Sequence, residues 1–220
     1  MNILVIAPHA DDEILGVGAT IAKYRSEGHN VSICIATKGY EPLFSKELVD
    51  IIRKEVTLCH KLLGIKDTFF LDFPAAMIEK VNRNELNDKL YEVVDKVKPE
   101  IVFLPHFGDM QKDHQIIAEA SMVALRPKYQ HRVNTIYSYE TLSETEWNIP
   151  HATNTFIPNV YIDVSNYISQ KLEAMKQYQS QLSSFPNPRS LEAIEALAKY
   201  RGSTINVKAA EAFALIRQIG

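Results

Sequence analysis

The sequence predicts a Rossmann-like α/β fold of three layers (α/β/α), in which a mostly parallel sheet lies between two layers of helices. Over the first 105 residues, short apolar runs alternate with longer segments of helical period. Continuous apolar runs are typical of strands buried on both faces. Their alternation with helices is the βαβ pattern of a parallel sheet. Ionisable residues gather after two of the runs, as expected at the ligand-binding edge of such a sheet.

The elements expected in this part of the chain follow one another without long loops. The strands are residues 2–7 (NILVIA), 30–37 (NVSICIAT), 68–73 (TFFLDF) and 100–105 (EIVFLP). The helices span residues 18–28, 45–64, 83–99 and 113–125. The second helix has the clearest ends, because Ser45 suits an N-cap and Gly64 suits a C-terminal stop.

The remainder of the chain is less regular. Two further strands are expected at residues 134–140 and 159–165, and two helices at residues 166–182 and 191–205. The Pro-rich segment 183–190 (SSFPNPRS) is expected to be a loop between these helices. Since no repeat or low-complexity segment is visible, we expect one domain over residues 1–220.

Composition excludes several classes of function. Apolar residues make up 46% of the chain and charged residues 23%, which is ordinary for a globular protein. The formal charge is 24 − 27 = −3, so the chain lacks the basic footprint of a protein that binds nucleic acid or anionic membranes. No apolar stretch approaches the ~20 residues that span a bilayer. Cys34 and Cys59 are expected to be buried free thiols, and a cytoplasmic location is expected.

Two groups of ionisable residues carry the chemistry. The first strand ends in PHADDE, which contributes His9, Asp11, Asp12 and Glu13. The fourth strand ends in LPHFGDMQKDH, which contributes His106, Asp109, Asp113 and His114. In a doubly wound sheet the loops after these two strands can lie side by side, although about a hundred residues separate them.

This mixture of imidazoles and carboxylates indicates a divalent metal site. Catalytic zinc is held by three protein ligands, and His9, Asp12 and His114 provide a His-Asp-His set. Asp11 is then placed to act as general base for a metal-bound water. Adjacent carboxylates without a cation would repel one another and raise one pKa, so the acidic group itself favours a cation.

Two other interpretations remain open at this point. The acidic residues of PHADDE could simply cap a helix N-terminus. The glycines of GVGAT, Gly16 and Gly18, are half of a dinucleotide-binding fingerprint, but three carboxylates precede them where a pyrophosphate would lie. Close packing of a helix on the sheet is the favoured explanation for these glycines.

The quoted motifs resemble those of the PIG-L/LmbE family of zinc-dependent de-N-acetylases. The family's A-H-P-D-D-E appears here as Pro8-His9-Ala10-Asp11-Asp12-Glu13, and its H-x-D-H as Gln111-Lys112-Asp113-His114. Segments such as YETLSETEW and NPRS resemble the branch found in bacterial polysaccharide and glycoconjugate gene clusters. Residues 1–130 are thus expected to carry the metal site and residues 131–220 to shape the substrate pocket.

The resemblance implies a role for several residues. It implies His9, Asp12 and His114 as ligands of Zn²⁺, although such sites accept other divalent transition metals. It implies Asp11 as general base and Asp113 as the residue that orients an imidazole. It also implies Arg53 as a substrate contact, while Asp72, at the end of the third strand, is a candidate to bind sugar hydroxyls.

Gln111 departs from the family, because it replaces the first His of H-x-D-H. A glutamine amide can donate a hydrogen bond to an oxyanion but cannot deliver a proton at neutral pH. Either Asp11 acts as both base and acid, or His106 from the same loop provides the proton. A catalytically weak protein is a third interpretation.

The expected function is metal-dependent hydrolysis of the N-acetyl group of an N-acetylglucosamine-type sugar in a glycan precursor or glycoconjugate. Water activated by the metal and by Asp11 would attack the acetyl carbonyl, releasing acetate and an amino sugar. The alternatives are an amidase for a non-sugar N-acyl conjugate, and a non-catalytic sugar- or nucleotide-binding protein. The expected partner is a small molecule, and the resemblance is compatible with a homo-oligomer.

Overall fold

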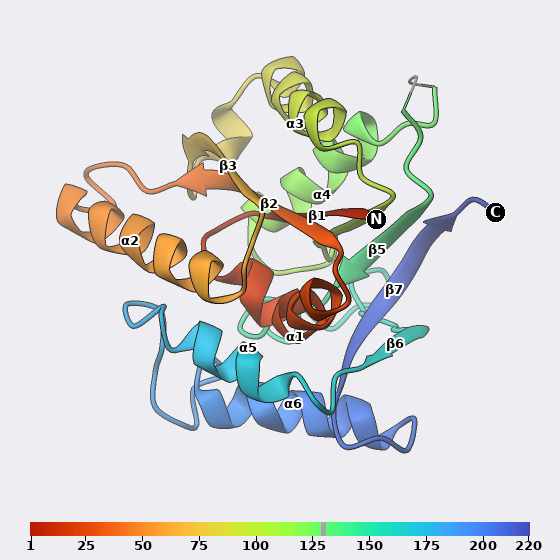
Figure 1. The fold of residues 1–220 in the computed structure, drawn as a ribbon. Coiled ribbons are helices and arrows are strands. Elements are labelled where there is room, and N and C mark those ends of the chain that lie inside the picture. Colours follow the sequence, from red (N-terminus) through yellow and green to blue (C-terminus); the bar gives the residue numbers. More distant parts are fainter. Residues whose placement is uncertain (129–130) are drawn as a thin grey trace.

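The computed structural model describes residues 1–128 and 131–220, which form one mixed sheet covered by helices (Figure 1). The sheet has seven strands in the order β3-β2-β1-β4-β5-β7-β6. They are β1 (Asn2–Ala7), β2 (Asn30–Lys38), β3 (Asp67–Pro74), β4 (Ile101–Pro105), β5 (Thr135–Tyr139), β6 (Val160–Asp163) and β7 (Ala210–Gln218). The first five strands of this order are parallel, so the predicted α/β fold with a mostly parallel sheet is confirmed.

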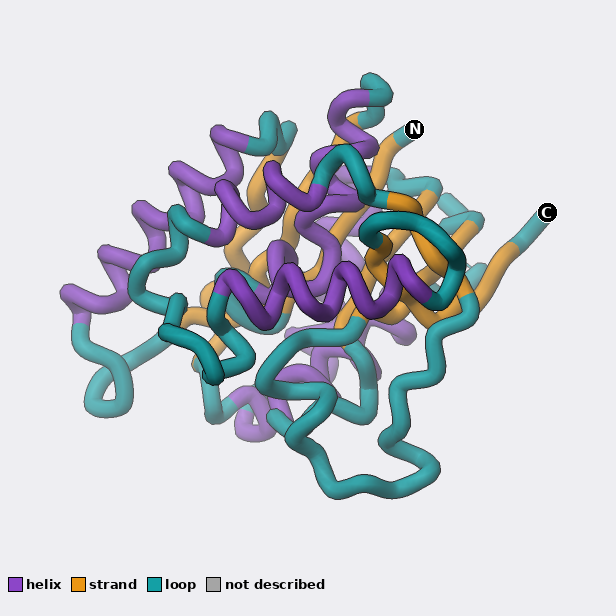
Figure 2. Tube along the Cα trace, turned by 90° about the horizontal axis from the view of Figure 1, so that it is seen from below, coloured by secondary structure: helices purple, strands orange, loops and turns teal. Residues whose placement is uncertain are grey.

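Helices cover both faces of the sheet, which gives the predicted three layers. The helices are α1 (Asp12–Ser26), α2 (Lys46–Leu62), α3 (Arg83–Val97), α4 (Lys112–Ala124), α5 (Ile168–Met175) and α6 (Leu191–Ser203), with a short 3₁₀ turn, η1 (Ile78–Lys80). In Figure 1, α3 and α4 lie on one side of the sheet, and α1, α5 and α6 lie on the other. Figure 2, seen from below, shows helices in front of the strands. Each interface is filled by its own cluster of buried apolar side chains.

The C-terminal strand β7 was not predicted. It inserts between β5 and β6 and runs antiparallel to both. Its first residues are Ala210, Glu211 and Ala212, which lack the β-branched and aromatic character of a typical strand. The buried Glu211 carboxylate is neutralised by Lys171 of α5, 2.6 Å away, and this partner is remote in the sequence.

Two helix boundaries also differ from the prediction. α1 begins at Asp12, not near Gly18, so the acidic residues of PHADDE form its first turn. α5 covers only Ile168–Met175 of the helix expected over residues 166–182, and the rest of that segment is made of turns and irregular chain. The strands and helices expected elsewhere are confirmed to within a few residues.

Gly16 allows α1 to approach the sheet closely. A Cβ atom at this position would lie 2.2 Å from Cδ2 of Tyr139, which no side chain tolerates. Tyr139 is fully buried, and its hydroxyl donates a hydrogen bond to the carbonyl oxygen of Ile6 at 2.9 Å. The packing interpretation of the glycines in GVGAT is therefore confirmed at Gly16.

The order of the strands positions the functional edge. The chain leaves β1 toward β2 on one side, whereas β4 pairs with the other side of β1. The carboxyl ends of β1 and β4 thus form a topological switch point, where parallel sheets bind ligands. Both ionisable loops, after β1 and after β4, begin there. Among the described residues, no helix combines the length and the apolar composition needed to cross a bilayer.

Candidate metal and catalytic site

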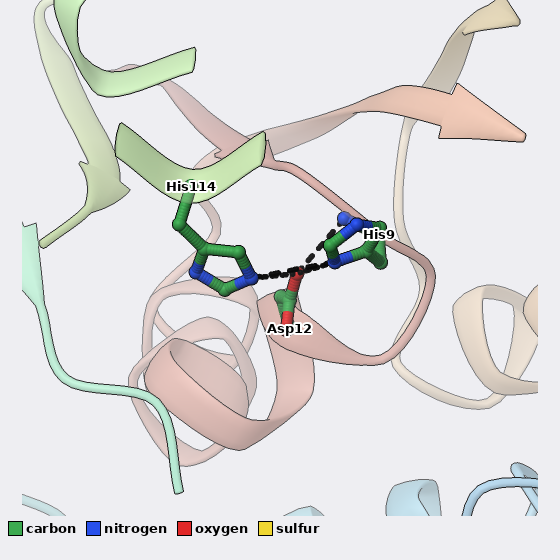
Figure 3. A group of neighbouring side chains, drawn as sticks. All are labelled: His9, Asp12 and His114. Atoms are coloured by element: carbon green, nitrogen blue, oxygen red, sulfur yellow. Dashed lines mark hydrogen bonds and ion pairs between the residues drawn. The ribbon is translucent and has the colours of Figure 1, made fainter. Parts of the chain in front are cut away.

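Three donor atoms from the two loops meet at the switch point (Figure 3). His9 Nδ1 lies 3.3 Å from Asp12 Oδ2 and 3.3 Å from His114 Nε2. His114 Nε2 lies 3.2 Å from Asp12 Oδ2. Tetrahedral coordination with bonds of ~2.0–2.1 Å places ligand atoms roughly 3.3 Å apart. The spacing of the three atoms therefore suits one divalent ion.

The remaining nitrogen of each imidazole is held by a second carboxylate. His9 Nε2 lies 2.9 Å from Asp113 Oδ2, and His114 Nδ1 lies 2.9 Å from Asp109 Oδ2. Thr145 in turn donates a hydrogen bond to Asp109 Oδ1 at 2.6 Å. Such carboxylates fix the tautomer and the orientation of a ligating histidine. Asp113 thus lies beside an imidazole, His9, as the sequence suggested. Asp109 holds the equivalent position beside His114.

The neighbouring ionisable groups of the site shift one another's pKa values. Burial alone would lower the pKa of His9, but hydrogen bonds to Asp113 and Asp12 raise it to about 9. Burial would likewise lower the pKa of His114, but Asp12 and Asp109 raise it well above its ordinary value. Burial would raise the pKa of Asp12, yet His114 and His9 hold it well below its ordinary value. Asp12 Oδ2 is the oxygen that faces both imidazoles, whereas Asp12 Oδ1 is buried without a hydrogen-bond partner among the described residues.

Asp11 lies at the N-terminus of α1 in an uncommon backbone conformation, with φ of 105°. Its side chain makes no capping hydrogen bond to the helix. Instead, Asp11 Oδ2 accepts a hydrogen bond from Arg189 Nη1 at 2.7 Å, while Oδ1 is buried without a partner among the described residues. Burial, only partly offset by Arg189, raises the pKa of Asp11 to about 8. The helix-cap interpretation is therefore wrong for Asp11.

Glu13 holds the backbone of Asp11. Glu13 Oε2 accepts a hydrogen bond from the Asp11 N–H at 3.0 Å. Its other oxygen accepts from the Tyr178 hydroxyl at 2.5 Å and lies 3.2 Å from His60 Nε2. Here the capping interpretation fits, since a carboxylate near a helix start satisfies a backbone N–H. The network fixes the conformation that turns the Asp11 side chain away from its own helix.

Gln111 lies at the N-terminus of α4, beside Glu144. Its Nε2 donates a hydrogen bond to Glu144 Oε1 at 2.8 Å, and its backbone N–H donates to Glu144 Oε2 at 3.2 Å. Gln111 also lines the cavity described next. The structure thus places it near the metal donors with its amide oriented by a carboxylate.

A cavity of about 660 Å³ opens beside these residues. Its lining includes His9, Asp11, Gln111, Asp113 and Arg189. A cavity of this size accommodates a ligand larger than a metal-bound water. Of the candidate ligands and base, His9 and Asp11 therefore line a cavity that is large enough for an organic ligand.

Two of the suggested substrate contacts, Arg53 and Asp72, pair with each other. Arg53 lines it, and Arg53 Nη2 is 2.5 Å from Asp72 Oδ1. The Arg53 guanidinium also lies over the ring of Phe70, 3.6 Å from its centroid. Asp72 accepts from Arg53, and its Oδ2 lies 3.7 Å from Lys38 Nζ. Asp72 is thus paired with cations rather than placed among the residues that line the pocket.

His106 is buried at the start of the loop after β4. Its Nε2 lies 3.0 Å from the carbonyl oxygen of Asn154, and its ring contacts Phe107 and Phe156. Within residues 1–128 and 131–220, His106 is not among the side chains that line the 660 Å³ cavity. The geometry therefore gives no support to His106 as the residue that delivers a proton.

Comparison with known proteins agrees with these features. The family model "PIG-L: GlcNAc-PI de-N-acetylase" matches residues 4–125, which is more than half of the chain and includes both ionisable loops. The chain belongs to the PIG-L family. The resemblance noted in the sequence is confirmed.

Alignments with several relatives extend over most of the chain. It is 30% identical over 192 residues to a probable N-acetyl-alpha-D-glucosaminyl L-malate deacetylase 2 of Bacillus subtilis (strain 168), covering 82% of this chain and 83% of the relative. It is 27% identical over 198 residues to the diacetylchitobiose deacetylase of Thermococcus kodakarensis, covering 82% and 70%. The crystal structure of a conserved protein from Thermus thermophilus matches with a TM-score of 0.82 and 27% identity, covering 100% of this chain and 96% of that one.

Sequence reasoning missed two residues of this PIG-L site. Arg189 comes from the segment 183–190, which was predicted only as a loop. Glu144 comes from the irregular segment after β5, and it was not singled out. Neither residue has a local signal of periodicity or spacing. The only available signal was the resemblance of YETLSETEW and NPRS to one branch of the PIG-L family.

Proposed function

We propose that this PIG-L protein is a zinc-dependent N-deacetylase that removes the acetyl group from an N-acetylglucosamine-type sugar in a glycan precursor or glycoconjugate. The observation that carries the proposal is that donor atoms of His9, Asp12 and His114 lie within 4.8 Å of one another, while His9 and Asp11 line one cavity. Relatives named as deacetylases of N-acetylglucosaminyl malate and of diacetylchitobiose support this substrate class.

His9, Asp12 and His114 would hold the metal ion, with Asp113 and Asp109 fixing the two imidazoles. A divalent ion in such a site supplies Lewis acidity and lowers the pKa of a bound water. We assign zinc because two imidazoles and one carboxylate are typical ligands of catalytic zinc.

Asp11 is assigned the proton transfers. Its free oxygen, Oδ1, is buried next to the donor set and can accept a proton from the attacking water. The water oxygen then bonds to the acetyl carbon, the C–N bond breaks, and Asp11 returns the proton to the leaving nitrogen. The products are acetate and a free amine. A pKa of about 8 without an ion would fall next to a divalent cation, which favours the ionised base.

Arg189 and Gln111 are assigned to the negative charge that develops at the carbonyl oxygen. Both line the cavity beside Asp11. The guanidinium keeps a positive charge next to the base, and the Gln111 amide, oriented by Glu144, can donate one further hydrogen bond. Since neither delivers a proton at neutral pH, the proton that reaches the leaving amine is assigned to Asp11.

The proposal extends to the cellular setting. Cys34 and Cys59 are both free and buried in the described structure, as is usual for proteins of reducing compartments. This supports a cytoplasmic location. A small-molecule sugar conjugate made in that compartment is the substrate we expect.

The test measures metal content and amine release together. The protein is purified, its metal is quantified, and amine release is followed on methyl N-acetylglucosaminide for wild type, Asp11→Asn and His114→Ala. We expect about one metal per chain with amine release in wild type, metal without turnover in Asp11→Asn, and loss of both in His114→Ala. Metal-loaded wild type that releases no amine from any N-acetylated glucosamine derivative contradicts the proposal.

A further inference from the structure

The 660 Å³ cavity has two chemically different parts. One part carries the site residues His9, Asp11 and Asp113. Another part of the lining, which we call the apolar wall, consists of Phe44, Leu48, Val49, Ile52, Val56 and Phe70. Both parts belong to the same continuous cavity, so a single substrate can contact both.

The apolar wall follows one face of α2. Phe44, Leu48, Ile52 and Val56 are spaced by four residues, which places the last three in one stripe of the helix. Val56 is 1% exposed and belongs to the core, whereas Leu48 and Ile52 are only half-buried. The stripe therefore continues from the core into the cavity, where its outer side chains remain in contact with solvent.

The cations near the wall do not make it an anion site. Arg53 lies flat on Phe70 and is paired with Asp72 at 2.5 Å. Lys38 lies 3.7 Å from the same carboxylate, so Asp72 offsets charge from both. The guanidinium thus extends the wall as a flat surface with its charge compensated.

An apolar wall does not suit sugar hydroxyls, which lose hydrogen bonds when they are pressed against hydrocarbon. It suits hydrocarbon, because covering half-buried leucine, isoleucine and phenylalanine side chains removes apolar surface from water. From this contrast, and resting on the proposed function, we propose that the substrate is an amphiphile: an N-acylated amino sugar bearing an apolar group that lies along the Phe44–Leu48–Ile52–Phe70 wall.

The apolar group has two chemical sources, which two series of substrates distinguish. In the first series the acyl group is acetyl and the aglycone is methyl, butyl or octyl, as α- and β-glycosides. In the second series the aglycone is methyl and the acyl group is acetyl, butanoyl or octanoyl. If the wall takes the group, kcat/KM rises roughly twofold to fourfold per methylene in one of the series. The series that responds identifies the source.

Leu48 tests the wall directly. Leu48→Asn should flatten the responding series, so that kcat/KM for its longest member falls toward the value for the methyl N-acetyl substrate. Leu48→Trp, which fills the cavity, should exclude the longest member. The matched control is Ile51→Asn, because Ile51 lies on the same helix, is 46% exposed and is not among the side chains that line the cavity in the described structure. Circular dichroism confirms that each variant folds.

Binding is measured separately, so that failure of the proposed function is recognised as such. Metal-loaded Asp11→Asn is titrated calorimetrically with methyl and octyl N-acetylglucosaminide and with methyl N-octanoylglucosaminide. We expect at least tenfold tighter binding of one octyl or octanoyl ligand, lost when Leu48→Asn is added. Equal affinity for all three, or flat kinetic series with turnover intact, overturns the inference. Tighter octyl binding without any amine release supports the wall and contradicts the proposed function.

Discussion

Arg189 Nη1 lies 2.7 Å from Asp11 Oδ2, although 178 residues separate them in the sequence. Arg189 Nε also donates a hydrogen bond to Ser143 Oγ at 2.9 Å, which anchors the guanidinium to a second loop. The pair brings the candidate base at the end of β1 into contact with the loop that precedes α6. Three separate parts of the chain therefore meet at one guanidinium.

Replacing Arg189 by Gln should lower kcat/KM for amine release by about 10²-fold, because a positive charge at the site is lost and the pKa of Asp11 rises further. Metal content should not change, since the hydrogen bonds of Arg189 in the described structure go to residues other than the three donors. Arg189→Lys should recover part of the loss. Arg83→Gln, at an exposed position of α3, is the control. Undiminished turnover in Arg189→Gln would show that the pair has no catalytic role.

Asp109→Asn should weaken metal binding by about 10- to 100-fold, because the carboxylate that orients His114 is replaced by a neutral amide. Affinity is measured by competition with a chelator of known metal affinity. Asp95→Asn, exposed on α3, should behave like wild type. If Asp109→Asn binds metal as tightly as the control, His114 does not depend on this hydrogen bond.

Metal binding should release protons and weaken as pH falls. In the metal-free chain, despite burial, hydrogen bonds to Asp113 and Asp12 raise the pKa of His9 to about 9, and Asp12 and Asp109 raise the pKa of His114 well above its ordinary value, so both imidazoles hold a proton more tightly than a free imidazole does. A ligating imidazole must present a free nitrogen, so protons compete with the ion and affinity should rise with pH up to about pH 9. Titration calorimetry in two buffers of different ionisation enthalpy measures the released protons. Identical heats in both buffers would mean that no proton is displaced.

Gly16→Ala should lower the free energy of unfolding by about 2 kcal/mol, because a methyl group at this position overlaps the buried ring of Tyr139. Urea denaturation provides the measurement. Gly220→Ala serves as the control, since a Cβ there meets nothing within 4 Å among the described residues. A variant as stable as wild type would mean that α1 and β5 move apart without cost.

The sequence was informative where the signal is local. Apolar runs and helical periods predicted the strands from β1 to β6 and most helices. The end-of-strand clusters predicted that His9, Asp12 and His114 lie together. What it could not reveal depends on partners remote in the chain. β7 carries Glu211 in a buried position, where Lys171 and the backbone N–H groups of Ala19 and Thr20 satisfy its carboxylate. The contact of Arg189 with Asp11 likewise exists only once the loop 183–190 has folded over the site.

The donor set and the charge partner of the base come from different halves of the chain. His9, Asp12 and His114, with Asp109 and Asp113 behind them, all precede residue 115, whereas Arg189 belongs to a loop near the C-terminus. Substitutions in that loop can therefore change the pKa of Asp11 and its access to the substrate without changing the affinity for the metal ion. Paralogues that differ only around residues 183–190 would keep the same metal-binding residues and act on different substrates.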